Sequence, residues 1–352
     1  FPARFKLKVG NFMNKYRASE IAAAINGKVT PEQIAIIESG LEPAVVIAGA
    51  GSGKTETMAN RVLYLIANGA AKPEEILGLT FTRKAAAELR QRIRKRLRQL
   101  IAANILPAGF NIEVPVMTYH SYAGSLLTEY GLRIGIDGDV ELVGDANLWQ
   151  QANSLIRNWA DEDFTYDSAL TTLIDDVIGL TKNVLEHQVN LEKLKNSQLK
   201  VLKQLESMSP SKADETAIVK GAIKVLSQRI RILPIVEKFI EQRRTGGAIA
   251  FDDQMSLAAE LAINLPQVGE IERAKFKLVL LDEYQDTSQS QVRMLSALFG
   301  NGHPVTAVGD PYQAIYGWRG AAIGTIKNFA QDFKGAKNEF NLSKTFRNHL
   351  AR

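Results

Sequence analysis

The segment AGAGSGKT, from Ala48 to Thr55, combines small residues with one cation and one hydroxyl. A loop of this kind turns successive backbone N–H groups inward at the start of a helix, so it can cradle phosphates. At this spacing we expect Lys54 to reach the β- and γ-phosphates of ATP and the Thr55 hydroxyl to hold Mg²⁺. Such loops usually begin with glycine, and here the first position is alanine. The predicted phosphate contacts are Ala48, Gly49, Ala50, Gly51, Ser52, Gly53, Lys54 and Thr55.

A second segment, LVLLDEYQD at 278–286, places two carboxylates directly after an apolar run. Asp282 is expected at the exit of a buried strand, where a metal ion can meet it. Glu283 follows and is free to orient and deprotonate a water molecule that attacks the γ-phosphate. The alternative is an acidic helix start, since carboxylates favour helix N-termini.

A third segment, GDPYQAIYGWRGA at 309–321, carries large aromatics and a fixed cation that no turn requires. The Trp318 indole offers every nucleobase a face to stack on, worth about 1–3 kcal/mol per base and indifferent to sequence. Arg319 can pair with a phosphate or bridge towards the nucleotide. The alternative for Trp318 is that it anchors the hydrophobic core.

Upstream, TPEQ at 30–33 has the form of a capping box, with Thr30 as the cap and Gln33 at the third helical position. Gln33 could instead read the edge of adenine. We expect one of these roles and not both, because a single amide would have to serve each.

The elements that must position these motifs follow from hydrophobic patterning. Lys54 to Asn68 is amphipathic and predicts a helix that crosses between two strands. Strands joined by helices indicate an α/β fold, with a parallel sheet and helices on both faces. Apolar runs predict buried strands at 44–49, 76–81, 114–118, 277–282 and 304–309.

Between residues 125 and 248 the pattern changes to Leu, Ile and Val at helical spacing, with one clear break at 207–215. We therefore expect a mainly α-helical domain inserted into the α/β domain. The expected division is an N-terminal extension at 1–29, a discontinuous α/β domain at 30–124 and 249–340, the insert at 125–248, and the start of a further domain at 341–352. The chain starts with Phe1 and stops in what looks like a continuing fold, so we expect a fragment.

Composition limits the class of protein. The 352 residues are 45% hydrophobic and 23% charged, as in soluble globular proteins. No apolar run approaches 18 residues, and the basic opening FPARFKLKVGNF lacks the features of a secretion signal, so we expect no membrane partner. Cysteine is absent, which excludes disulfides and agrees with a cytoplasmic location.

Charge is distributed unevenly. The net charge is +5, but Arg83 to Arg98 contains eight basic side chains and only one acidic one, Glu88. A basic stripe on one helix suits a polyanion such as nucleic acid. It is equally typical of a solvated helix face.

Six ordered motifs resemble the UvrD/PcrA/Rep-like DNA helicases of superfamily 1. They are AGAGSGKT, LTFTRKAAAELRQRI, VMTYHSYAGSLL, LVLLDEYQDTSQSQ, VTAVGDPYQAIYGWRGA and LSKTFRN. The resemblance covers most of residues 30–125 and 248–350. It implies that the α/β domain is a P-loop NTPase (RecA-like) ATPase domain and that residues 341–352 start a second motor domain. The wording LEPAVVIAGAGSGKTETMANRV also resembles the helicase-nuclease subunits of actinobacteria, especially the AdnB type.

The resemblance implies further site residues. Gln313 would sense the γ-phosphate, and Arg347 would act as an arginine finger. Phe346 would stack on adenine, whereas Glu56 replaces an arginine often found on the other face of the base. Arg61 joins the nucleotide-contacting set. The DNA-binding set implied by the resemblance is Phe81, Thr82, Arg83, Tyr119, His120, Tyr316, Trp318 and Arg319.

The function implied is an ATP- and Mg²⁺-dependent motor on single-stranded and duplex DNA, of 3′-5′ type, that acts in DNA repair, with a helicase-nuclease subunit as a possible partner. An arginine finger contributes about 10³–10⁵ in turnover, so a fragment that lacks later motifs should hydrolyse ATP poorly and unwind nothing. Two alternatives stay open. One is a non-catalytic subunit that braces a partner motor, and the other is a P-loop ATPase independent of nucleic acid.

Overall fold

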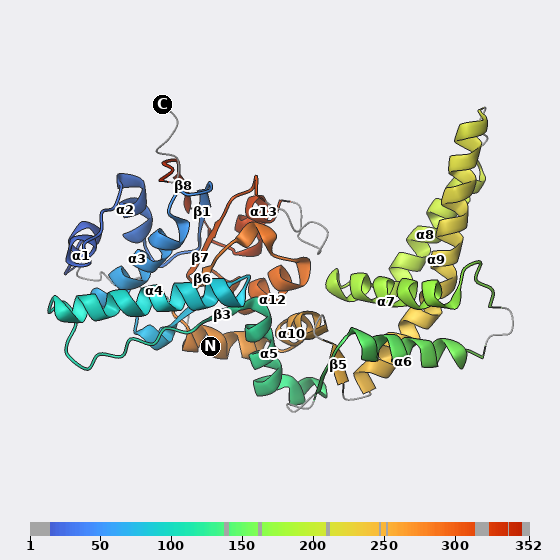
Figure 1. Cartoon of the computed structure of the whole chain (residues 1–352), viewed down its shortest axis with the longest axis horizontal. Coiled ribbons are helices and arrows are strands. Elements are labelled where there is room, and N and C mark those ends of the chain that lie inside the picture. The colour runs from blue at the N-terminus through green and yellow to red at the C-terminus, as the bar shows by residue number, and fades with distance from the viewer. Residues whose placement is uncertain are drawn as a thin grey trace, which may run out of the picture. The chain divides into compact units, whose positions relative to one another are not determined.

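A computed structural model describes residues 15–136, 141–160, 164–208, 212–245, 248–250, 253–313, 324–336 and 338–346 (Figure 1). The chain divides into two compact units. Unit 1 combines Phe1–Ala123 with Ala262–Arg352, and unit 2 is Gly124–Leu261.

Unit 1 is built on a six-stranded parallel sheet, in the order β3-β2-β6-β7-β1-β8. The α/β fold expected from the sequence is confirmed, and each predicted strand is found within two residues of its expected limits. A sixth strand extends the sheet beyond β1, to Leu342. The strands are β1 (Ala44–Ala48), β2 (Ile76–Thr80), β3 (Val116–Thr118), β6 (Leu278–Leu281), β7 (Val305–Gly309) and β8 (Asn338–Leu342).

The sheet is buried between helices, which is why its central strands read as continuous apolar runs. Every residue of β2, β6 and β7 is buried. The helices are α1 (Ala18–Ala24), α2 (Pro31–Ile37), α3 (Lys54–Ala67), α4 (Arg83–Ala102), α5 (Tyr119–Tyr130, which runs on into unit 2), α11 (Pro266–Lys275), α12 (Gln289–Phe299) and α13 (Thr325–Asp332). Short 3₁₀ turns occur at η1 (Pro73–Glu75) and η3 (Tyr284–Asp286).

An aromatic cluster fixes the turn that follows β6. The Tyr284 ring meets the edge of Phe329 at 5.7 Å between centroids and Phe333 at 6.3 Å, and the two phenylalanine rings stack at 4.8 Å. All three side chains are buried. This packing ties η3 to α13 and so holds the residues between β6 and α12 in place.

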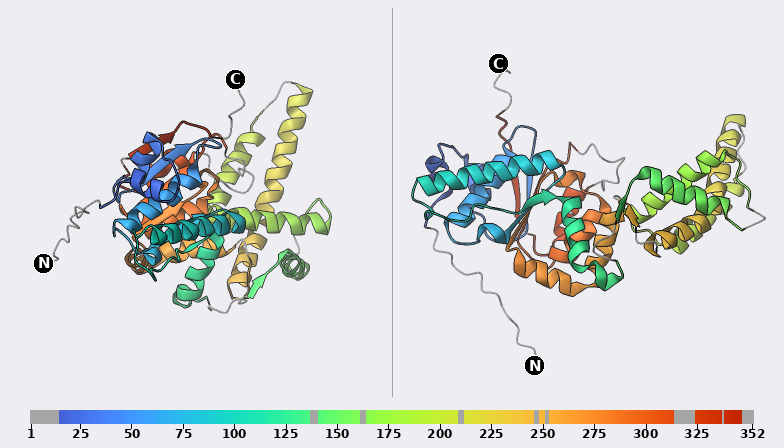
Figure 2. Two further views of the ribbon diagram at one scale, coloured as in Figure 1. Left: turned by 60° about the vertical axis from the view of Figure 1, so that its left-hand side comes forward. Right: turned by 60° about the horizontal axis from the view of Figure 1, so that its bottom comes forward.

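Unit 2 is mainly helical, as expected (Figure 2). Its core is formed by residues such as Ile174, Val177, Ile235 and Phe239. The boundary between α8 and α9 lies at the expected break at 207–215, since α8 ends at Glu206 and α9 begins at Ala213. Its elements are η2 (Gly131–Ile134), β4 (Glu141–Val143), α6 (Asp145–Arg157), α7 (Leu170–Glu186), α8 (Leu191–Glu206), α9 (Ala213–Thr245), β5 (Ala248–Ala250) and α10 (Asp253–Asn264, which ends in unit 1).

The sequence did not predict the short parallel pairing of β4 with β5 in unit 2. Three-residue strands carry too little alternation to be recognised from patterning. Within the described ranges, no helix is both long and apolar enough to cross a membrane.

Candidate nucleotide site

The loop between β1 and α3 has the conformation that its glycines permit. Gly51 and Gly53 adopt φ values of 73° and 84°, in the left-handed region that favours glycine. The Ser52 hydroxyl and backbone N–H both donate to the carbonyl oxygen of Gly49, at 2.8 and 3.3 Å. The loop therefore forms a compact turn at the N-terminus of α3, where helix N–H groups can receive phosphate oxygens.

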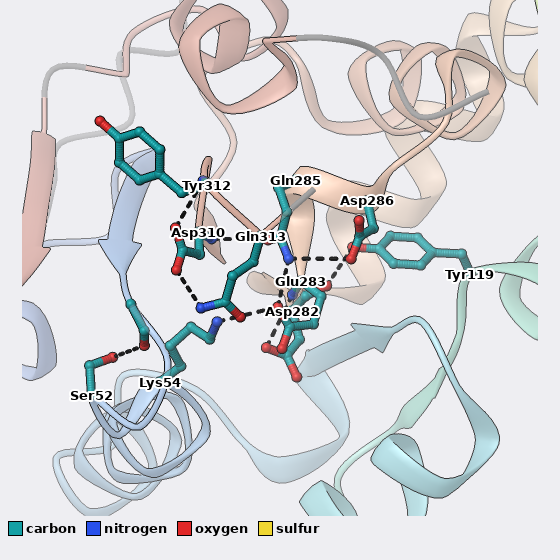
Figure 3. Close-up of polar contacts among 11 residues, drawn as sticks. Ser52, Lys54, Tyr119, Asp282, Glu283, Gln285, Asp286, Asp310, Tyr312 and Gln313 are labelled. Atoms are coloured by element: carbon teal, nitrogen blue, oxygen red, sulfur yellow. Dashed lines mark hydrogen bonds and ion pairs between the residues drawn. The ribbon is translucent and has the colours of Figure 1, made fainter. Parts of the chain in front are cut away.

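Two carboxylates face this loop from the end of β6 (Figure 3). Lys54 Nζ lies 3.4 Å from Glu283 Oε2, although the residues are 229 positions apart. Glu283 is one of the few described non-glycine residues with positive φ, at 50°. Such a conformation costs of order 1–3 kcal/mol and persists where the surroundings impose it. Strain at this residue is typical of a functional position.

Asp282 is buried, and its environment favours the protonated form. Burial is the largest cause and the nearby Glu283 charge the second; together they raise the pKa of Asp282 to about 6. The cation Lys54 and the backbone N–H of Glu283, which donates to Asp282 Oδ1 at 3.1 Å, oppose this shift. The ionised form of such a buried carboxylate is strongly stabilised when a cation binds beside it.

Gln285 connects the carboxylates to the end of β7 (Figure 3). Its amide nitrogen donates to Glu283 Oε2 at 2.9 Å and to Asp286 Oδ2 at 3.3 Å. Its carbonyl oxygen accepts from the backbone N–H of Asp310 at 3.0 Å. The space it occupies depends on Gly309, where an added Cβ would lie 2.5 Å from Gln285 Oε1.

Asp310 extends this chain of hydrogen bonds into the loop after β7. Its Oδ2 accepts from Gln313 Nε2 at 2.6 Å, and its Oδ1 accepts from the backbone N–H of Tyr312 at 2.9 Å. The same carboxylate approaches the phosphate loop, since a Cβ on Gly49 would lie 3.9 Å from Oδ2. Tyr312 itself is 95% exposed.

The sequence prediction named Gln313 but missed Gln285, Asp310 and Tyr312. The signal for Gln285 and Asp310 was present, because each polar side chain follows a buried strand by one to four residues. Which of these side chains bond to one another depends on the neighbouring positions of β6 and β7 in the sheet, and spacing in the sequence does not give that.

Gln33, Phe346 and Glu56 converge on the other side of the phosphate loop, around Gly53. A Cβ at Gly53 would lie 3.0 Å from Gln33 Nε2, 3.7 Å from Phe346 Cε2 and 3.8 Å from Glu56 Cβ. Phe346 is 45% exposed, and its backbone N–H donates to the Gly51 carbonyl at 2.8 Å. These three side chains, each predicted to contact nucleotide or its base, form one cluster.

The capping box on α2 is present, but it uses only one end of the Gln33 amide. Gln33 Oε1 accepts from the Thr30 backbone N–H at 3.0 Å, and the Thr30 hydroxyl accepts from the Gln33 N–H at 3.3 Å. The amide nitrogen faces Gly53. The expectation that capping excludes a nucleotide contact was therefore too strict, because an amide has two functional ends.

Arg61 lies away from the nucleotide-contacting cluster, which corrects its predicted role. Its side chain is fully buried and donates to the carbonyl oxygens of Ile36, Ser39 and Gly40 at 2.7, 3.0 and 2.8 Å. Desolvation lowers the pKa of its guanidinium to about 10. Arg61 holds the turn after α2 and has no exposed surface to offer a ligand.

Tyr119 is a second correction. It was expected to contact DNA, but its ring is buried and its hydroxyl donates to the Asp282 carbonyl oxygen at 3.2 Å. Burial raises the pKa of this phenol. A residue enclosed beneath the end of β6 cannot stack on a base, so Tyr119 supports the position of Asp282.

The remaining described members of the predicted DNA set lie at the start of α4 and α5. Thr82 caps α4, since its Oγ1 accepts from the Ala85 backbone N–H at 3.1 Å, and both Thr82 and Arg83 are exposed. Phe81 and His120 are half-buried. Tyr316, Trp318, Arg319 and the predicted arginine finger Arg347 lie outside the described residues.

The residues present fit a nucleoside triphosphate with Mg²⁺. In the described ranges, no group of three or more His, Asp or Glu side chains could hold a metal alone. Mg²⁺ commonly takes one or two protein ligands together with substrate phosphates and water. Thr55 and Asp282 offer a hydroxyl and a carboxylate of this kind, beside a loop shaped for phosphates.

Known proteins resemble the chain along most of its length. ATP-dependent DNA helicase UvrD1 of Mycobacterium leprae is 27% identical over 325 residues, which are 90% of this chain and 37% of that protein. DNA helicase II of Rickettsia typhi is 28% identical over 336 residues, 94% of this chain and 42% of that protein. ATP-dependent DNA helicase PcrA of Staphylococcus aureus is 28% identical over 325 residues, which are 92% of this chain and 38% of that protein. The chain thus spans about two fifths of the length of these relatives.

The UvrD/REP helicase N-terminal domain matches residues 29–334. This range begins just before α2 and ends just after α13, so it includes every strand from β1 to β7 and the described nucleotide site apart from Phe346. Because the match covers most of the chain, we conclude that the chain belongs to the family of the UvrD/REP helicase N-terminal domain.

Proposed function

We propose that this chain is the ATP-hydrolysing part of an ATP-dependent DNA helicase. The observation that carries the proposal is the continuous polar chain from Lys54 and Glu283 through Gln285 and Asp310 to Gln313. It joins a phosphate-binding loop to the start of the segment at 309–321, which contains the aromatic residues suited to stacking on bases.

In this proposal the residues divide the work of hydrolysis. Thr55 and Asp282 would hold Mg²⁺, which would neutralise phosphate charge when bound. Glu283 orients and deprotonates the attacking water, which requires that Lys54 leave Glu283 for the phosphates. Gln313, which lies within the same hydrogen-bonded chain, would respond to the γ-phosphate. Arg347 would supply an arginine finger.

The adenine end of the substrate would lie among Gln33, Phe346 and Glu56. The Phe346 ring is exposed enough to stack on a base, and the Gln33 amide nitrogen is directed towards Gly53. Glu56 is occupied by Arg92 and Arg96 of α4, so its carboxylate does not confront the base as a free charge.

Single-stranded DNA would lie against Trp318, Tyr316 and Arg319, with Phe81, Thr82 and Arg83 as further contacts. The described Tyr312, which is almost fully exposed, adds another stacking surface at the start of this loop. Translocation of 3′-5′ type, a role in DNA repair, a helicase-nuclease partner and a cytoplasmic location stay predictions that depend on the family resemblance.

The test is the rate of ATP hydrolysis by the full-length protein with and without single-stranded DNA. We expect strong stimulation by DNA, and Trp318→Ala should remove most of it while nucleotide binding is retained. Trp149→Ala is the matched control, because Trp149 lies partly exposed on α6 in unit 2. Turnover unaffected by DNA would favour a P-loop ATPase independent of nucleic acid. Normal activity of an assembly that contains Glu283→Gln would instead favour a bracing subunit.

A further inference from the structure

Helix α4 borders a hollow on unit 1 that shares only Glu56 with the nucleotide-contacting cluster. Its volume is ≈ 880 Å³, and α4, whose course is shown in Figure 1, contributes eight of its ten lining residues. The lining residues are Ile25, Glu56, Glu88, Gln91, Arg92, Arg94, Lys95, Arg96, Arg98 and Gln99. Five of these ten side chains are cationic and two are acidic.

Part of this positive charge is neutralised within the protein. Glu56 pairs with Arg92 at 3.4 Å and also with Arg96, which donates to Asn60 Oδ1 at 2.8 Å. Arg94 pairs with Glu113 at 2.6 Å.

Lys95 and Arg98 are exposed, and no acidic group of the described residues lies within ion-pair distance of either. The hollow therefore keeps a surplus of positive charge beside a 20-residue helix.

The composition of the hollow selects between forms of nucleic acid. Proteins that bind unstacked single strands combine basic grooves with aromatic platforms. No aromatic side chain among the described residues lines this hollow, so unstacked bases would gain little there. A duplex keeps its bases stacked and presents a dense array of phosphates, and neutralising these releases condensed counterions.

We propose that the hollow along α4 binds the phosphate backbone of duplex DNA, with Glu56 as its internal counterion. The choice of DNA as the polyanion rests on the proposed function; the site itself does not depend on ATP hydrolysis or on the aromatic loop. DNA phosphates would compete with Glu56 for Arg92 and Arg96.

Glu56 lies one residue after Thr55, in the first turn of α3. Duplex binding at α4 and nucleotide binding at the phosphate loop would therefore be coupled, in both directions.

The experiment is fluorescence anisotropy of this chain with a labelled 20-base-pair DNA duplex across a salt series. Lys95→Ala with Arg98→Ala should weaken binding and reduce the slope of log affinity against log salt by about 2, or about 1 per lost phosphate contact. Glu56→Gln should strengthen binding and steepen the slope, because it releases Arg92 and Arg96. Thermal unfolding of each variant establishes that it is folded.

The matched control is Lys200→Ala with Lys203→Ala on α8, which removes the same charge from exposed positions. An equal loss in both double variants would overturn the proposal, because it would reflect net charge alone. An unchanged slope in the α4 variant, or clearly tighter binding to an RNA duplex of the same length, would also overturn it. The proposed single-strand contact is tested separately by Trp318→Ala with a single-stranded oligonucleotide, so either contact can fail without the other.

Discussion

Lys54 and Glu283 form an ion pair, with Nζ 3.4 Å from Oε2, across the space where the triphosphate is expected. The lysine side chain is 11% exposed and the glutamate 39%. The pair joins the first strand's loop to the end of β6. In the proposed function Lys54 binds the phosphates and Glu283 activates the attacking water, so the two side chains would separate when substrate enters.

Glu283→Gln should therefore separate binding from hydrolysis. Loss of the ion pair frees Lys54, so nucleotide affinity should rise. Hydrolysis should fall by about 10²-fold or more, because an amide cannot accept the proton from water. Binding of a fluorescent ATP analogue and release of phosphate in the full-length protein measure the two effects. Weaker binding together with slower turnover would show that Glu283 serves mainly to position Lys54.

Asp282→Asn should stabilise the folded protein in a pH-dependent manner. The pKa of Asp282 is raised from 3.8 to about 6 in the folded state. The folded protein thus holds a proton that the unfolded chain releases near pH 4, and wild-type stability falls as the pH rises from about 4 to about 6. The amide has no charge to bury, so the folded state should gain about 3 kcal/mol at pH 7.5. This gain should vanish towards pH 4.

Urea denaturation of the chain at pH 4.5, 6 and 7.5 tests how the stability gained by Asp282→Asn changes with pH. The control is Asp145→Asn, since Asp145 is exposed on α6. An Asp282→Asn gain that is larger at pH 4.5 than at pH 7.5 would contradict the assignment. The same variant should lose Mg²⁺-dependent hydrolysis, because Asp282 is a proposed metal ligand. In the wild type, Mg²⁺ binding should weaken below about pH 6 as the carboxylate becomes protonated.

Arg61→Lys should destabilise unit 1 although it retains the charge. A lysine cannot reproduce the fork that binds the carbonyl oxygens of Ile36, Ser39 and Gly40. Leaving buried acceptors unpaired costs about 1–3 kcal/mol. Urea denaturation should show this loss, and nucleotide affinity measured on the remaining folded protein should change little. A large loss of affinity with unchanged stability would restore Arg61 to the nucleotide-contacting set.

Gly309→Ala should disturb the site by displacing the Gln285 side chain. The added methyl would lie 2.5 Å from Gln285 Oε1 and 2.9 Å from Ile326 Cδ1, so Gln285 must move away from the Asp310 N–H. Overpacking of this kind costs about 1–3 kcal/mol, and ATP turnover should fall with it. Gly40→Ala is the matched control, because a Cβ there meets nothing within 4 Å. Equal effects of the two substitutions would exclude a specific role for the Gln285 bridge.

Much of the fold and part of the site could be predicted from interactions between residues that are close in the sequence. The glycines of the phosphate loop, the apolar runs and the capping box at Thr30 each act within a few residues, so the sequence predicted the parallel sheet, the crossover helix α3 and the placement of Asp282 at a strand exit. Six ordered motifs also indicated the family. β8 (Asn338–Leu342) escaped prediction because it is short, and only Phe340 and Leu342 among its more buried positions are apolar.

Tertiary structure decided which side chains meet. Tyr119 and Arg61 were placed by motif among ligand contacts, but packing buries both and turns their donors to carbonyl oxygens. Glu56 forms ion pairs with residues of α4, and Gln285 links the end of β6 to the end of β7. These partners are too far apart in the sequence for its periodicity to predict them. The physical reason is that a sequence pattern reports the environment each residue prefers, whereas partners across a sheet are set by strand order and by the burial of the whole fold.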